Sequence, residues 1–123
     1  MAQWVYPNGS AAQGDWEVSL GTADSAPVEG WAYTGLKVAD IKAGQVLHLD
    51  GADEERLVIP LSGSYDVTSD DGAYHLRGRK DVFSGPTDVV YVGVGSSIDI
   101  TALGDGRVAV ATSPAATKYP DQL

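Results

Sequence analysis

The chain has 123 residues, a length that suits a single domain with a buried core. Seventeen acidic residues against eight basic ones give a formal net charge of −9, which repels phosphate backbones and anionic lipid headgroups. Nucleic acid and membrane surfaces are therefore excluded as expected partners. The absence of cysteine also excludes disulfides and thiolate metal sites.

No targeting signal is visible in the sequence. The first residues form neither a basic region nor an apolar run, so they do not resemble a secretory signal. No stretch approaches the roughly 20 consecutive apolar residues of a membrane-spanning helix. We therefore expect a soluble, cytoplasmic protein.

The order of elements predicts an all-β domain. Residues 1–30 are interrupted by glycine and proline, and we predict an extended N-terminal arm that packs on a barrel formed by residues 31–113. Apolar and polar residues alternate in short segments and none has a helical period, which indicates half-buried strands. The predicted strands are 16–20, 31–41, 46–50, 56–61, 64–68, 73–76, 88–92, 97–101 and 107–111. Short strands separated by glycine-rich turns favour an antiparallel β-barrel or jelly roll.

Three local features refine this prediction. Pro60 lacks a ladder donor, so we expect it at a bulge or a sheet edge. Asp71-Gly72 predicts a tight hairpin with positive φ angles. Residues 114–123 contain two prolines and lose the alternation, which predicts a linker towards a further domain.

The segment from Gly44 to Gly63 carries a recognisable spacing. Its two glycines match the metal-binding motif of the cupins, in which a His-x-His pair and a later glutamate lie between two glycines. The three ligand positions are occupied here by Asp50, Ala52 and Arg56. Alanine cannot coordinate a metal, and arginine places a fixed positive charge where the metal would lie. The segment therefore resembles a cupin barrel without the usual metal ligands.

The fourth ligand position and the histidine count agree with this interpretation. Ile98 occupies the position of the last histidine, and the chain contains only His48 and His75, too few for a three-histidine site. We therefore predict no cofactor and no metal in this chain. The remaining alternative is a makeshift site made of His48, Asp50 and Glu54 or Glu55.

Other catalytic patterns are also missing. No serine lies in a Gly-x-Ser-x-Gly nucleophile elbow, and the acidic pairs do not follow the spacing of a calcium loop. We therefore predict no catalytic residue.

Positive charge is concentrated in residues 77–80. Arginine offers a planar fork that can bind a carboxylate or phosphate, but the same patch could neutralise nearby acids or support a subunit contact. The residues that we single out as candidate ligand or interface contacts are Arg56, Arg77, Arg79 and Tyr91.

A second block of sequence is more specific. Residues 78–95 resemble the run Arg-x-x-Val-Phe-x-Gly-Pro-Pro-x-x-x-Tyr-x-Pro-x-Gly of the 5-deoxy-glucuronate isomerases of myo-inositol catabolism. This chain departs from the run at Thr87 and Gly93, where the family has proline. Further matches are Trp31, Tyr33, Gly35, Val38, Ala43-Gly44, 61–63, 111–115 and Tyr119-Pro120.

This resemblance implies a particular organisation and function. Members of the family have two cupin domains, and their metal-binding residues belong to the C-terminal one, so no catalytic residue is carried over to this chain. We therefore expect a metal-free N-terminal cupin half of an aldose–ketose isomerase, with a divalent metal in the C-terminal cupin domain. That domain is the expected partner, within a homo-oligomer, and the half itself would be structural. The alternative is a stand-alone cupin that binds a sugar acid without catalysis.

Overall fold

The computed structural model describes residues 5–21, 28 and 30–123, and these form strands and loops without any helix. The described residues accordingly contain no helix that is long and apolar enough to cross a membrane. The strands are β1 Val18–Leu20, β2 Gly35–Ile41, β3 Val46–Leu49, β4 Glu54–Ser69, β5 Gly72–Arg79, β6 Val90–Val92, β7 Ile98–Ala102 and β8 Gly106–Pro114.

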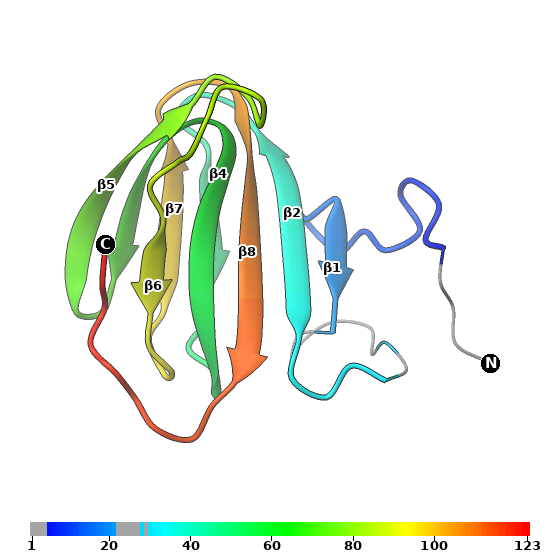
Figure 1. Cartoon of the computed structure of the whole chain (residues 1–123), viewed down its shortest axis with the longest axis vertical. Helices are drawn as coiled ribbons and strands as arrows, with labels where there is room; N and C mark the ends of the chain where they lie inside the picture. Colours follow the sequence, from blue (N-terminus) through cyan, green and yellow to red (C-terminus); the bar gives the residue numbers. More distant parts are fainter. Residues whose placement is uncertain (1–4, 22–27, 29) are drawn as a thin grey trace.

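These strands form two curved antiparallel sheets that share β4 (Figure 1). The first half of β4 pairs with β8 and β6, and β8 continues through β2 to β1. The second half of β4 pairs with β5 and β7, and β7 continues to β3. A strand that passes from one sheet to the other closes the two layers around one core. The predicted antiparallel β-barrel of jelly-roll type is confirmed.

The long β4 corrects one prediction. Residues 56–61 and 64–68 were expected as two strands, but they form one bent strand with register shifts after Pro60 and Gly63. The bulge expected at Pro60 is confirmed. Gly63 has a φ of 89°, a conformation that only glycine adopts readily, so the chain turns here without leaving the ladder.

Two further predictions were wrong in detail. Residues 31–34 are not part of β2, because its ladder ends at Gly35, which pairs with Thr112. The hairpin between β4 and β5 exists, but neither Asp71 nor Gly72 has a positive φ. Instead, the turn is stabilised by a side chain: the Ser69 hydroxyl accepts a hydrogen bond from the Asp71 amide at 3.1 Å.

Side chains fill the interior of the barrel. Tyr65 is fully buried, donates its hydroxyl to the Ser62 carbonyl at 2.7 Å, and has its pKa raised to about 12 by burial. The fully buried aliphatic residues around it include Val58, Val67, Leu76, Val90, Val92, Ile100, Val108 and Val110. An eight-stranded barrel has little spare room once such side chains point inward.

The described part of the N-terminal arm continues the sheet at the edge of β2 and adds Trp16 to the hydrophobic core. Within it, β1 lies in the region where residues 16–20 were expected to form a strand, and it pairs with β2. Lys37 is 2% exposed: its Nζ donates to the Ser19 hydroxyl at 2.9 Å and lies 5.5 Å from the centre of the Trp16 ring. The aliphatic stem and the cation–π contact let a lysine be buried under the arm.

The C-terminal segment does not extend away from the barrel. Residues 115–123, here called the strap, leave β8 and run back across the lower end of the barrel beside β6 and β5 (Figure 1). Tyr91 and Gln122 exchange two backbone hydrogen bonds of 2.8 and 3.0 Å, so the strap covers the free edge of β6. That residues 114–123 also lead to another domain stays a prediction.

Candidate functional site

The end of the barrel where a cupin metal would lie is here called the mouth. It is formed by the connections 50–53, 70–71 and 93–97 together with the strap. The two motif glycines both have positive φ angles, 83° at Gly44 and 89° at Gly63, which glycine adopts readily. The motif positions Asp50, Ala52, Arg56 and Ile98 all lie at this end of the barrel, next to the starts of β4 and β7 and the end of β3.

Arg56 fills the mouth from inside. Its side chain is 4% exposed, and its two terminal nitrogens donate to the carbonyl oxygens of Asp50 at 2.6 Å and Ser96 at 3.0 Å. Its Nε lies 3.6 Å from Oε1 of the equally buried Glu54. The guanidinium thus joins the β3–β4 and β6–β7 connections in the way that a bound ion would join its ligands.

The residues at the four ligand positions do not fit a metal. Ala52 has no donor side chain, Ile98 is fully buried and apolar, and the cation of Arg56 would repel a second cation. Among the residues that the structure describes, no group of three His, Asp or Glu side chains is arranged to hold an ion. The residues at these four positions therefore form a donor set unsuited to binding a metal.

The makeshift site considered above is formed only in part. His48 on β3 lies between two aspartates: Nε2 is 2.8 Å from Oδ1 of Asp50, and Nδ1 is 2.6 Å from Oδ1 of Asp99. Glu54 is buried, whereas His48 is exposed on the outer side of its strand. The hydrogen bonds to Asp99 first and to Asp50 second raise the pKa of His48 above its usual 6.5.

This arrangement predicts a pH dependence. Because the folded pKa is raised, the stabilisation from charged His48 is fully present below about pH 6.5 and is lost as the pH rises through the folded pKa. An NMR titration of the imidazole protons should give a midpoint above 6.5, and Asp99→Asn should move it downward. A midpoint at or below 6.5 in the native chain would contradict the contact.

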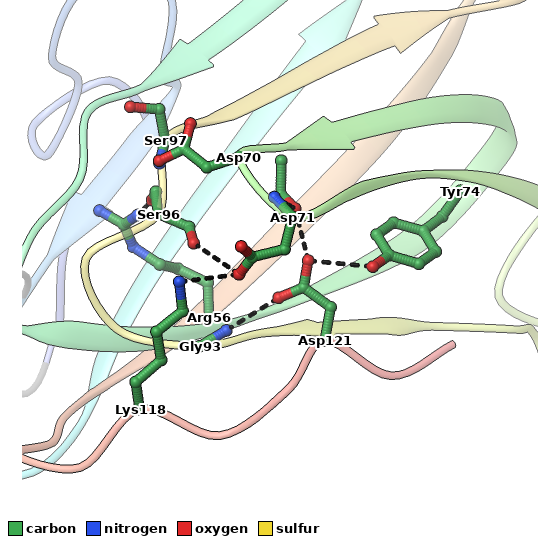
Figure 2. A network of polar contacts seen from close by, with 10 residues as sticks. Arg56, Asp70, Asp71, Tyr74, Gly93, Ser96, Ser97, Lys118 and Asp121 are labelled. Atoms are coloured by element: carbon green, nitrogen blue, oxygen red, sulfur yellow. Dashed lines mark hydrogen bonds and ion pairs between the residues drawn. The ribbon is translucent and has the colours of Figure 1, made fainter.

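The strap is tied to both sheets at the mouth (Figure 2). Lys118 forms a 2.7 Å ion pair with Asp71, which lowers the pKa of that carboxyl and raises the pKa of the lysine. Asp121 accepts hydrogen bonds from the Ser69 hydroxyl, from the Tyr74 hydroxyl at 3.0 Å and from the Gly93 amide at 3.3 Å. Since Tyr74 belongs to β5 and Gly93 follows β6, Asp121 links the open edges of the two sheets.

Two shallow cavities lie along residues 118–122 of the strap. One of about 490 Å³ is lined by Asp71, Tyr74, Lys118, Tyr119, Pro120 and Asp121. The other, of about 600 Å³, is lined by Glu55, Tyr91, Tyr119, Pro120, Asp121 and Gln122. In the second, the Tyr91 hydroxyl donates to Oε2 of Glu55 at 2.6 Å, and this bond together with burial raises the pKa of Tyr91 to about 12.

The four residues singled out from the sequence do not converge on one site. Arg56 and Tyr91 lie near the mouth on paired strands, β4 and β6. Arg79 lies at the opposite end of the barrel, where Nε and a terminal nitrogen donate to the carbonyls of Pro60 at 3.2 Å and Gly85 at 2.8 Å. Arg77 is exposed on the same strand, β5. These side chains therefore lie at two opposite ends of the barrel and cannot bind one ligand together.

Sequence reasoning missed the contacts that the strap residues Lys118 and Asp121 and the hairpin residue Asp71 make. Their partners lie between 25 and 52 positions away in the chain. A local pattern carries no signal for such contacts, and the two prolines of residues 114–123 indicated a linker instead.

The chain matches the sequence profile of the KduI/IolB family over residues 4–123. It is 36% identical over 93 residues to a 5-deoxy-glucuronate isomerase of Bacillus velezensis and 31% identical over 93 residues to that of Bacillus subtilis strain 168. Each alignment covers 74% of this chain and 34% of the relative, so the chain spans about a third of the length of the curated relatives it matches.

Solved structures agree with the fold. An IolB-like protein from Salmonella typhimurium LT2 superposes with a TM-score of 0.71 and 28% identity, covering 76% of this chain and 36% of that protein. The cupin domain of Schizosaccharomyces pombe Cnp3 superposes with a TM-score of 0.57 at 16% identity, covering 83% of this chain and 66% of its own, which supports the cupin fold alone. With a matching profile over nearly its whole length, the chain belongs to the KduI/IolB family and has a cupin fold.

Proposed function

We propose that this chain is the N-terminal, metal-free cupin half of a 5-deoxy-glucuronate isomerase. Its role in such an enzyme is structural: it pairs with a C-terminal cupin domain and contributes to a homo-oligomer in the cytoplasm. The names of the relatives support the reaction, and the share of their length that the chain covers supports a half-protein role.

The observation that carries the proposal is the position of Arg56. Its guanidinium lies where a cupin uses a glutamate ligand, and its donors are directed at the carbonyls of Asp50 and Ser96. A site closed by a cation that is already hydrogen-bonded does not bind a divalent metal. The barrel is therefore a scaffold in which an arginine takes over the cross-linking role of the ion.

The chemistry of the reaction places catalysis elsewhere. An aldose–ketose isomerisation moves a proton between adjacent carbons, which needs a base at the carbon and an electrophile at the carbonyl oxygen. In this chain His48 is held between two aspartates on the outer surface, away from any cavity described above. A divalent metal in the C-terminal domain would supply the electrophile.

The proposal is tested by assaying the purified 123-residue chain for isomerisation of 5-deoxy-glucuronate. The full-length Bacillus velezensis isomerase, loaded with metal, serves as the positive control. We expect no turnover above the uncatalysed rate and no stoichiometric transition metal by elemental analysis of untagged protein. Turnover by the metal-free chain, or one bound metal per chain, would contradict the proposal.

The stand-alone sugar-acid binder is less well supported. That alternative relies on Arg56 or Arg79 to hold a carboxylate, but both direct their donors at backbone carbonyls. A carboxylate would have to break these bonds before the arginine could bind it. Calorimetric titration with glucuronate should therefore show no binding.

A further inference from the structure

The loop between β5 and β6, residues 80–89, presents an apolar side chain to solvent. The loop leaves β5 at the end of the barrel opposite the mouth (Figure 1). Within it, Phe83 is 93% exposed and Val82 is 48% exposed. A single exposed apolar residue is ordinary on a protein surface. Phe83 is unusual because the loop that carries it is held in place.

Three sets of hydrogen bonds fix this loop. Arg79 donates to the carbonyls of Pro60 and Gly85, which anchors the loop to β4. Oδ1 of Asp81 accepts the Phe83 amide and the Ser84 hydroxyl, both at 2.9 Å. At the far end, Asp88 accepts the amides of Gly78 at 2.9 Å and Arg77 at 2.7 Å; burial opposes ionisation, but these bonds lower the pKa of its carboxyl. A preformed loop loses little entropy when it binds a partner.

Three cations lie beside the loop in an otherwise acidic protein, and the loop's own acids Asp81 and Asp88 are occupied by the hydrogen bonds named above. Arg77, Arg79 and Lys80 account for three of the eight basic residues, and Arg77 and Lys80 are exposed. The surface that receives Phe83 should therefore combine an apolar recess with negative charge.

The mouth of the same chain has this combination. The 600 Å³ cavity is walled by Tyr91, Tyr119 and Pro120, and the carboxylates of Glu55 and Asp121 also line it. Its volume and aromatic walls suit a phenyl ring, and its acids suit the cations beside Phe83. The protrusion and the cavity lie at opposite ends of the barrel.

We propose that Phe83 of one copy inserts into the strap cavity of a second copy, with Arg77 and Lys80 facing Glu55 and Asp121 of that copy. This head-to-tail contact deepens the oligomeric role proposed above by naming its surfaces. A symmetric contact through two Phe83 loops would place the same cations against each other. Head-to-tail interfaces form rings or open chains according to their rotation.

The test uses two surface variants that each remove one side of the contact. Phe83→Asp removes the apolar protrusion, and Tyr119→Lys places a like charge in the cavity facing Lys80. In sedimentation velocity each variant alone should stay a monomer of 12.8 kDa, while the native chain forms larger species that weaken with added salt. Tyr33→Asp, at a 76% exposed position outside both surfaces, should associate like the native chain.

Mixing the two variants makes the test specific. The Tyr119→Lys copy keeps an intact loop and the Phe83→Asp copy keeps an intact cavity, so an equimolar mixture should give a 1:1 dimer and nothing larger. Unchanged thermal melting of each variant shows that it is folded. A native chain that stays monomeric, a Phe83→Asp chain that still associates, or a mixture without the dimer would each overturn the proposal. Isomerase activity does not enter these measurements, so their outcome is independent of the assigned reaction.

Discussion

Gly78→Ala should destabilise the barrel by more than about 4 kcal/mol, an exceptional loss for one methyl group. A Cβ at this position would lie 1.7 Å from the carbonyl oxygen of Gly63 and 2.8 Å from its carbonyl carbon. Both atoms belong to the backbone of β4 at its bend, and that strand is paired on both sides. The φ of 68° at Gly78 adds a left-handed penalty of about 1–2 kcal/mol. Since domains of this size are stable by only about 5–15 kcal/mol, the variant should be largely unfolded.

Gly44→Ala is the matched control. Its φ of 83° carries the same kind of backbone penalty, but no atom lies within 4 Å of the position that the new Cβ would occupy. Denaturant unfolding followed by circular dichroism should give a loss of about 1–2 kcal/mol for this variant. Equal losses for the two variants would show that β4 and β5 are not in close contact at Gly63.

Much of the fold follows from local patterns. Alternation and glycine-rich turns located the strands of the barrel, and Gly44 lies in the turn expected between β2 and β3. The continuity of β4 was missed because a proline and a glycine normally end a strand, whereas here each produces a bulge within a ladder that continues. Pairing with β8 on one side and β5 on the other keeps the strand intact.

At the mouth, the sequence predicts which metal ligands are missing but not the contacts that replace them. The identities of Ala52, Arg56 and Ile98 are enough to predict that the usual metal ligands are missing. What replaces them is not readable from the sequence, because the acceptors of Arg56 are backbone carbonyls, which carry no side-chain signal. One of them, that of Ser96, is 40 positions away. The strap was missed for the same reason, since Asp121 contacts residues that are distant along the chain.

Arg56→Ala should lower the free energy of unfolding by about 3–5 kcal/mol, the usual effect of removing one member of a buried charged pair. The substitution removes the donors of two carbonyls and the cation that lies 3.6 Å from the buried carboxylate of Glu54. Arg56→Lys should recover only part of this loss, because one ammonium group cannot span the carbonyls of Asp50 and Ser96 as the guanidinium does.

Two further variants separate the charge from the cross-link. Arg77→Ala, at an exposed arginine on β5, should change stability by no more than about 0.5 kcal/mol. The double variant Glu54→Gln, Arg56→Met removes both buried charges, so it should be more stable than Arg56→Ala alone. Hydrogen exchange supplies the local readout: the Gly95 amide, which donates to the Ala52 carbonyl at 2.8 Å, should lose protection in Arg56→Ala and keep it in Arg77→Ala. If Arg56→Ala melts like the native chain and Gly95 stays protected, the guanidinium does not hold the mouth together and does not take over the role of a metal.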